Sequence, residues 1–188
     1  MNQGKLIIFA APSGSGKTSI VKFLLEQNIP LKFSISATTR PKRMDEKEGV
    51  DYFFLSAEQF QSKIDAGDFV EWEEVYAGTY YGTLKSEVDK MLEKGERVLF
   101  DVDVLGALNI KKIYDEQALA LFVKPPSVEI LVERLKNRGT ESEESLKRRI
   151  DKATYELSFE QNFDKTIVNT DLEEAQNEAK QIVLNFIK

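Results

Sequence analysis

Ala11-Pro12-Ser13-Gly14-Ser15-Gly16-Lys17-Thr18 is the stretch that decides the fold of this chain. The apolar run at 6–10 before it is typical of a strand buried on both faces, and residues 18–28 after it have apolar side chains at helical spacing. Strand, glycine-rich turn and helix together indicate a phosphate-binding loop (P-loop), in which backbone N–H groups and the helix dipole surround an anion. We expect Lys17 to reach the outer phosphates and the hydroxyl of Thr18 to ligate the accompanying magnesium.

Position 11 departs from the usual P-loop pattern, which has glycine there. Alanine adopts ordinary helical or extended dihedrals but not positive φ, so we expect Ala11 to lie in an allowed region. Gly14, Gly16, Lys17 and Thr18 are present, and they surround the phosphates most closely. The alternative is a surface turn rich in glycine and serine ahead of a helix. The coincidence of strand, Gly-Lys-Thr and helix favours the P-loop.

The composition is that of an ordinary domain, and it excludes several kinds of chemistry. The absence of cysteine excludes disulfides and thiolate catalysis and is typical of a cytoplasmic protein. The absence of histidine removes the usual general base and the commonest zinc ligand. The apolar runs are too short to span a membrane, and the start of the chain has no signal-peptide pattern. A net charge of −6 argues against a nucleic-acid partner.

Most arginines fall in two stretches of the chain. They are Arg40 and Arg43, followed by Arg134, Arg138, Arg148 and Arg149. Because Pro41 sets an extended path, Arg40 and Arg43 can converge on one phosphate, each with a planar fork of donors. Arginines gathered in an acidic protein suit a small polyphosphate better than a polymer. The alternative is two solvated helix faces with incidental charge.

The segment 34–83 mixes short strands with one short helix, and we predict that it is an insertion. Strands are predicted at 31–36, 51–55 and 69–72, a helix begins with the capping box Ser56–Gln59, and 76–83 predicts a hairpin or tight loop. Glu71 alternates with its apolar neighbours on the strand at 69–72, so its side chain points away from theirs.

The remaining chain predicts a parallel α/β core and a lid. Helices are expected at 84–95 and 128–137, then around Leu146, Ile150, Ala153 and Leu157, and finally after a capping box at Thr170–Glu173; strands are expected at 97–103, 118–123 and 165–169. Two helices joined by an acidic loop, with arginines on both, predict a mobile lid near 126–155. Asp101 and Asp103 have the same parity at a strand end, so we expect them to face one side. In phosphate-binding folds a carboxylate at this point, beside the loop, holds magnesium directly or through water. The alternative is a strand that simply ends in polar residues.

An ordered set of motifs along nearly the whole chain resembles the guanylate kinases, which phosphorylate GMP with ATP. The motifs are Pro12-Ser13-Gly14-Ser15-Gly16-Lys17-Thr18, Ser36-Ala37-Thr38-Thr39-Arg40, Asp51-Tyr52, Phe69-Val70-Glu71-Trp72, Tyr80-Tyr81-Gly82-Thr83, Asp101-Val102-Asp103, Pro125-Pro126-Ser127, Arg138-Gly139-Thr140-Glu141 and Ile167-Val168-Asn169. The P-loop alone would indicate only a superfamily, whereas this ordered set is far more specific. The resemblance implies a step in guanine nucleotide recycling, with ATP as co-substrate and Mg²⁺ as cofactor.

The resemblance also implies residue roles, position by position. The implied ligands of the GMP phosphate are Arg40, Arg43, Tyr52 and Tyr81, and the implied guanine readers are Ser36, Glu71 and Thr83, with Asp103 near the base. The implied lid arginines are Arg134, Arg138 and Arg149, while Asn169 resembles the residue beside the adenine of ATP. Catalysis is expected from Lys17, Arg43 and the lid arginines, and Mg²⁺ binding from Thr18 and Asp101. Thr83 stands where the family often has serine, and the hydroxyl is kept.

The guanine assignment also has a chemical reason. Guanine has two N–H donors side by side, at N1 and N2, and an acceptor at O6. An ionised Glu71 accepts from both donors, and a hydroxyl such as that of Ser36 or Thr83 can donate to O6. Adenine would instead place a lone pair against a buried carboxylate, which can support discrimination of order 10⁴.

These observations together predict an α/β fold and a nucleoside monophosphate kinase that acts on GMP or dGMP. The fold is a three-layer P-loop core with a central parallel sheet, at 1–33 and 84–188, with a mixed α+β GMP-binding insertion at 34–83 and a helical lid. The oligomeric state stays open. Two alternatives remain at this point: a kinase for another monophosphate such as AMP, and a catalytically silent module with the kinase fold that binds proteins.

Overall fold

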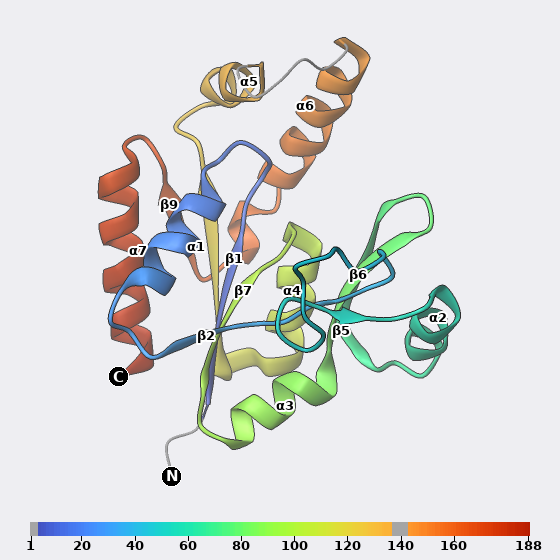
Figure 1. Cartoon of the computed structure of the whole chain (residues 1–188). Helices are drawn as coiled ribbons and strands as arrows, with labels where there is room; N and C mark the ends of the chain where they lie inside the picture. The colour runs from blue at the N-terminus through green and yellow to red at the C-terminus, as the bar shows by residue number, and fades with distance from the viewer. Residues whose placement is uncertain (1–3, 137–142) are drawn as a thin grey trace.

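The core of the molecule is a parallel sheet of five strands, in the order β2-β7-β1-β8-β9 (Figure 1). We describe residues 4–136 and 143–188 of the computed structural model. The strands are β1 (Lys5–Ala10), β2 (Leu31–Phe33), β7 (Arg97–Asp101), β8 (Ala118–Lys124) and β9 (Lys165–Val168). Because β1 lies at the centre and all strands run parallel, the loop that follows β1 opens at the carboxyl edge of the sheet, where α/β folds bind ligands.

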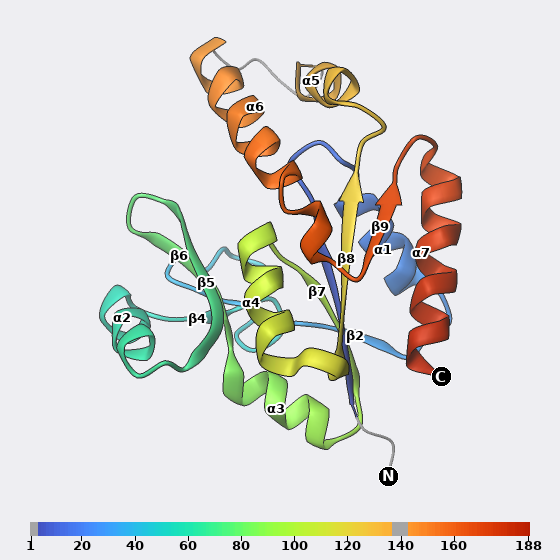
Figure 2. The same cartoon turned by 180° about the vertical axis from the view of Figure 1, so that it is seen from behind.

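Helices cover both faces of this sheet and give the core three layers (Figures 1 and 2). One face packs against α1 (Lys17–Glu26) and α7 (Leu172–Ile187), and the other against α3 (Lys85–Glu93) and α4 (Val104–Tyr114). On β1, Ile7 and Phe9 belong to the first cluster and Leu6 and Ile8 to the second, all with no exposed surface. The predicted strand buried on both faces is confirmed.

A second, mixed sheet of four strands lies beside the core, in the order β4-β3-β6-β5. Its strands are β3 (Ala37–Thr38), β4 (Phe53–Phe54), β5 (Phe69–Tyr76) and β6 (Thr79–Leu84), and α2 (Ala57–Asp65) packs on it through the buried Phe60. The predicted capping box is present, because Ser56 accepts from the Gln59 N–H and Gln59 accepts from the Ser56 N–H. β5 and β6 form the predicted hairpin, which turns at Gly78 with φ 77°.

The single strand predicted at 31–36 is wrong, because the chain changes sheets there. β2 ends at Phe33 in the core sheet, and β3 begins at Ala37 in the second sheet. The Ser34 N–H donates to the carbonyl of Leu99 in the core, whereas the carbonyl of Ser36 accepts from the Phe53 N–H in the second sheet. The hydrogen bonds of this segment therefore belong to two different sheets, which an alternating polar and apolar pattern does not reveal.

Two helix starts also differ from the sequence-based prediction. The strand predicted at 97–103 ends at Asp101, and Asp103 is the N-cap of α4, a helix that was not predicted; its carboxylate accepts from the Gly106 N–H at 2.6 Å. At the final helix the cap is Asp171 and not Thr170, with the Asp171 carboxylate accepting from the Glu174 N–H at 3.0 Å. In both cases an aspartate competes well for the cap position, because its charged oxygen also interacts with the helix dipole.

The remaining helices, α5 (Val128–Lys136) and α6 (Glu143–Leu157), stand beyond the carboxyl edge of the core sheet (Figure 1). They pack on each other through Leu131, Leu135 and Ala153, with Leu146 and Ile150 partly buried against them. This is the helix pair predicted as a lid, and the predicted inward face of α6 is confirmed. Within residues 4–136 and 143–188, no helix combines the length and the apolar character that a membrane span would need.

Candidate functional site

The glycine-rich turn joins the end of β1 to the start of α1, and two of its glycines are required by the backbone. Gly14 and Gly16 have φ of 92° and 90°, in the left-handed region where a side chain is strained. Gly16 is also the N-cap of α1, so the turn presents free backbone N–H groups at the positive end of that helix. Ala11 is not among the residues with positive φ, as predicted, and it is buried in the core.

Asn169, directly after β9, holds this turn through a hydrogen bond. Its Nδ2 donates to the carbonyl of Ser15 at 2.7 Å, and Arg134 Nη2 on α5 donates to the carbonyl of Asn169 at 3.0 Å. A Cβ on Gly16 would lie 2.2 Å from Asn169 Nδ2, so only glycine leaves room for this contact. Asn169 and Arg134 thus hold the turn in its present shape.

Lys17 points across the turn to the end of the neighbouring strand β7. Its ammonium forms an ion pair with Asp101 Oδ1 at 2.6 Å and a hydrogen bond to the carbonyl of Val102. Both side chains are mostly buried, with 17% and 22% of their surface exposed. The predicted phosphate-binding lysine and the predicted magnesium-binding carboxylate are therefore brought together.

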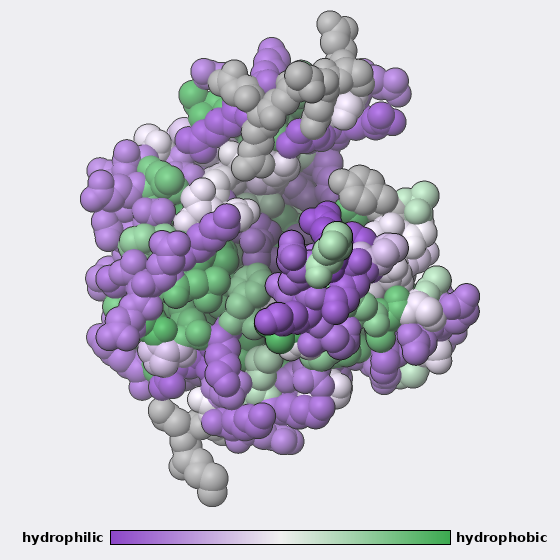
Figure 3. All heavy atoms as spheres, viewed as in Figure 1, coloured by the Kyte–Doolittle hydropathy of each residue, from purple (hydrophilic) through white to green (hydrophobic). Residues whose placement is uncertain are grey.

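A cavity of about 1030 Å³ opens between the turn, the second sheet and the lid helix α6, and Figure 3 shows a hollow between the helices at the top and the rest of the molecule. This volume lies at the upper limit of the range for sites that hold one drug-sized ligand. The predicted site residues that line the cavity are residues 11–18, Ser36, Tyr52, Glu71, Tyr81, Asp101, Asp103 and Arg149. The turn and the predicted guanine readers Ser36 and Glu71 therefore face one shared space, whereas Thr83 is not among the residues that line it.

At one end of the cavity, Glu71 on β5 is buried, with 9% of its surface exposed. Thr83 on β6 is fully buried beside it, and its hydroxyl donates to Glu71 Oε1 at 2.6 Å. The pKa of Glu71 is raised to about 7, chiefly by burial; the Thr83 hydrogen bond opposes this effect, and the nearby carboxylates of Asp103 and Glu73 add to it. The cavity wall therefore includes a buried acid with a raised pKa.

Arg40 is held by a residue that the sequence analysis missed. Glu46 accepts from Arg40 Nη1 and Nη2 at 3.0 and 2.7 Å, and from the Arg43 N–H at 2.8 Å. The hydrogen bonds from Arg40 and from the Arg43 backbone lower the pKa of Glu46 to about 2. The sequence shows that Glu46 follows Arg43 by three residues, which could have indicated an ion pair. Only the folded loop shows that the side chain it binds is that of Arg40.

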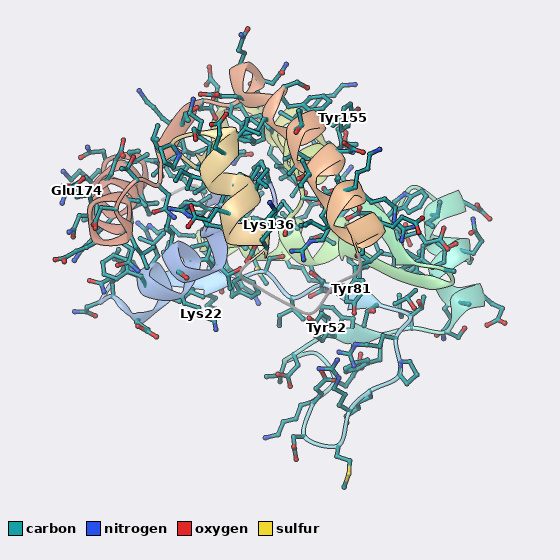
Figure 4. All side chains as sticks on the ribbon, turned by 90° about the horizontal axis from the view of Figure 1, so that it is seen from above. Lys22, Tyr52, Tyr81, Lys136, Tyr155 and Glu174 are labelled. Carbon is teal, nitrogen blue, oxygen red and sulfur yellow. The ribbon has the colours of Figure 1, made fainter. Side chains whose placement is uncertain are left out.

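The two predicted tyrosines lie next to Arg40. The Tyr81 hydroxyl accepts from Arg40 Nε at 3.3 Å, and the Tyr52 ring lies 5.2 Å from the Arg40 guanidinium. The two rings are 5.9 Å apart, side by side below the lid helices in Figure 4. Arg43 is exposed, and neither it nor Arg40 belongs to the cavity wall in the described part of the chain. The structure thus groups Arg40 with both tyrosines but leaves Arg43 outside.

The lid helices bring one predicted arginine directly to the turn. Arg149 Nη2 on α6 donates to Ser13 Oγ at 3.0 Å, whereas Arg134 is directed to Asn169 as described above. Arg138 lies outside the described residues. The sequence analysis also missed Lys152 on α6, whose ammonium contacts Glu73 Oε1 on β5 at 3.0 Å. Nothing in the local sequence of either residue indicates that pairing.

Comparison with known proteins gives a consistent result over nearly the whole chain. The family model described as guanylate kinase matches residues 3–185. A guanylate kinase of Bacteroides thetaiotaomicron is 55% identical over 184 residues, which cover 98% of this chain and 90% of that protein. One of Porphyromonas gingivalis is 49% identical and covers 97% of this chain and 98% of that protein. A crystal structure of guanylate kinase from Anaplasma phagocytophilum superimposes with a TM-score of 0.73 at 29% identity, covering 98% of this chain and 87% of that one.

Proposed function

This chain belongs to the guanylate kinase family, and from that premise we propose how its cavity holds GMP and ATP end to end during phosphoryl transfer. As a member of the family, it is a nucleoside monophosphate kinase that transfers the γ-phosphoryl group of ATP to GMP, giving GDP and ADP. The observation that carries our assignment of the two ends is the buried carboxylate of Glu71, which faces the same cavity as the glycine-rich turn.

The ATP end is assigned to the P-loop, residues 11–18. Backbone N–H groups at the start of α1 would bind the phosphates, and Asn169 would lie near the adenine while it supports the turn. Lys17 is an ion-pair partner of Asp101 in the structure. We propose that Lys17 turns to the phosphates when ATP binds, which leaves the carboxylate of Asp101 available.

The residues at this end fit a magnesium ion. The candidate ligands are the Thr18 hydroxyl and the Asp101 carboxylate, both oxygen donors of the kind that Mg²⁺ prefers. Across residues 4–136 and 143–188 there is no cluster of three or more Asp, Glu, His or Cys side chains that could hold a metal alone. Such an ion would therefore depend on substrate phosphates and water for its other ligands, and it would neutralise charge on the phosphates.

The GMP end is assigned to the insertion 34–83, which forms its own sheet and its own apolar cluster beside the core. Glu71 would accept from guanine N1–H and N2–H. Because the single hydroxyl hydrogen of Thr83 already points to Glu71, we assign the donor to guanine O6 to Ser36 and give Thr83 the role of orienting the carboxylate. Asp103 lies close enough to affect the pKa of Glu71 and would take part in the same contacts.

The GMP phosphate is assigned to Arg40, Tyr52 and Tyr81, with Arg43 joining when the loop that carries it moves inward. Its oxygen is already anionic, so it can attack the γ-phosphorus in line without a general base, which agrees with a chain that has no histidine. Lys17 and the lid arginines Arg134, Arg138 and Arg149 would neutralise the developing charge. Closure of the lid would exclude water, which otherwise competes as nucleophile.

The experiment that tests this assignment is a coupled assay with ATP, Mg²⁺ and a series of monophosphates. GMP should be the best substrate; inosine monophosphate, which keeps N1–H and O6 but lacks the N2 amine, should be intermediate; AMP, CMP and UMP should be poor. Equal turnover of AMP and GMP would overturn the role of Glu71. No turnover of any monophosphate, together with no ATP binding by calorimetry, would favour a catalytically silent binding module. Whether dGMP is used equally is read from the same assay.

The cytoplasmic location and the absence of a nucleic-acid partner stay predictions, supported by the composition of the chain.

A further inference from the structure

One ion pair joins the lid to the insertion across the cavity. Lys152 Nζ on α6 lies 3.0 Å from Glu73 Oε1 on β5. On α6, Lys152 follows Arg149, which reaches the P-loop, and precedes Glu156 by one turn, with 3.9 Å between Lys152 Nζ and Glu156 Oε1. On β5, Glu73 is two residues from Glu71 and shares its face. Both partners of the pair therefore stand directly beside groups that the reaction uses.

The surroundings of Lys152 differ from those of an isolated surface lysine. Its charge faces three carboxylates, Glu73, Glu156 and Asp103. Partial burial lowers the pKa of Lys152, but the hydrogen bond to Glu73 and the charges of the three acids outweigh this effect and raise it. The same burial, only partly offset by Lys152, raises the pKa of Glu156. Lys152 thus lies among acidic groups contributed by the insertion, the core and the lid, and Lys17 is a second cation that acts on Glu156.

The pair also forms the boundary of the main cavity. Glu73, Asp103, Lys152 and Glu156 line both the main cavity and a second one of about 70 Å³. The rest of the small cavity is mostly apolar, with Val104, Leu105, Tyr155 and Phe159. Tyr155 lies on the outer side of α6 in Figure 4. The pair therefore lies where the two cavities adjoin, near Glu71.

We propose that Lys152 is a positioning residue that fastens the lid helix α6 to the insertion through Glu73, and so favours the closed cavity around GMP. This inference rests on the assignment of the insertion to GMP. The ion pair requires α6 and β5 to be close together, so it stabilises only the closed arrangement. If GMP binds the closed arrangement more tightly than the open one, an interaction that stabilises the closed arrangement also strengthens GMP binding. Because the two side chains are 58% and 37% exposed, we expect only a small effect, roughly two- to fivefold in apparent GMP affinity.

The test compares Lys152→Met, Glu73→Gln and the double variant in steady-state kinetics. The Lys147→Met variant is the matched control, since Lys147 is an exposed lysine on the same helix. The assays are run at about pH 8.5, where Glu71 is ionised in every variant and a change in its pKa does not contribute. KM for GMP should rise roughly two- to fivefold in both single variants and no further in the double variant. The kcat value should not fall, and Lys152→Arg should restore KM.

A second measurement separates this role from a general loss of packing. The difference in KM between the unaltered protein and Lys152→Met should shrink as salt is raised from about 0.05 to 0.5 M, because salt screens exposed charges. An unchanged KM in Lys152→Met, an equal effect in Lys147→Met, or effects that multiply in the double variant would each overturn the proposal. All three results leave GMP phosphorylation intact, whereas failure of the unaltered protein to phosphorylate GMP would overturn the proposed function itself.

Discussion

Replacing Glu71 with glutamine should stabilise the fold while it removes the proposed contact with guanine. The pKa of Glu71 rises from an ordinary value of 4.5 to about 7, chiefly because the carboxyl group is buried. A raised pKa in the folded state means that folding favours the protonated acid. Between pH 4.5 and about 7 the unfolded chain has released this proton and the folded chain has not, so stability falls as pH rises through this window. The neutral amide of the glutamine variant carries no such cost.

The size of the effect follows from the pKa shift. One pKa unit corresponds to about 1.4 kcal/mol, so the full shift amounts to roughly 3 kcal/mol at pH 8. At pH 5 most of this difference is absent, because that pH lies only just above the pKa of the carboxyl group in the unfolded chain. The amide oxygen of glutamine can still accept from Thr83, so that hydrogen bond is preserved.

The assay is urea unfolding of both proteins at pH 5 and pH 8, followed by linear extrapolation. The advantage of Glu71→Gln in free energy of unfolding should grow by roughly 2–3 kcal/mol between the two pH values. Glu93→Gln, at an exposed glutamate on α3, serves as the control and should change stability little at either pH. If Glu71→Gln is no more stable than the unaltered protein at pH 8, burial of the ionised Glu71 carboxylate does not destabilise the fold as we infer.

Three further predictions concern the same cavity. KM for GMP should rise about tenfold between pH 8 and pH 6, because Glu71 takes up a proton. The GMP phosphate also titrates in this range, and Glu71→Gln should show only the smaller change in KM that this titration causes. Parallel pH profiles of KM in the two proteins would contradict the role of Glu71. Lys17→Ala should lower kcat by at least ~10³ with the fold intact by circular dichroism, and a near-normal rate would count against the assigned role of the P-loop. Ser15→Ala should leave stability unchanged or raise it by up to about 1 kcal/mol in thermal unfolding, because Ser15 Oγ is buried without a hydrogen-bond partner among the described residues; a clear loss of stability would show that the hydroxyl has a partner.

Patterns local in sequence predicted most of the core. The P-loop, the buried strand before it and the capping box of α2 depend on a few neighbouring residues, and all are present in the structure. The apolar stripe of α6 was equally clear, because helical periodicity extends over several turns. Predictions failed where the chain changes sheets, at 34–36, and where two local patterns competed. Asp103 reads as the end of an apolar strand, and only its hydrogen bond to Gly106 shows that it begins a helix.

The sequence by itself determined that this protein has a P-loop at the centre of an α/β core, and its ordered motifs determined which family it resembles. Only the tertiary structure decided which side chains meet. The contacts of Glu46 with Arg40, Thr83 with Glu71 and Lys152 with Glu73 bring together groups whose positions depend on how the loop, the hairpin and the lid fold back on the core. The physical reason is that backbone preferences act over a few neighbouring residues. Hydrogen bonds and ion pairs in a cavity instead form between any two groups that tertiary packing places within about 3–4 Å of each other.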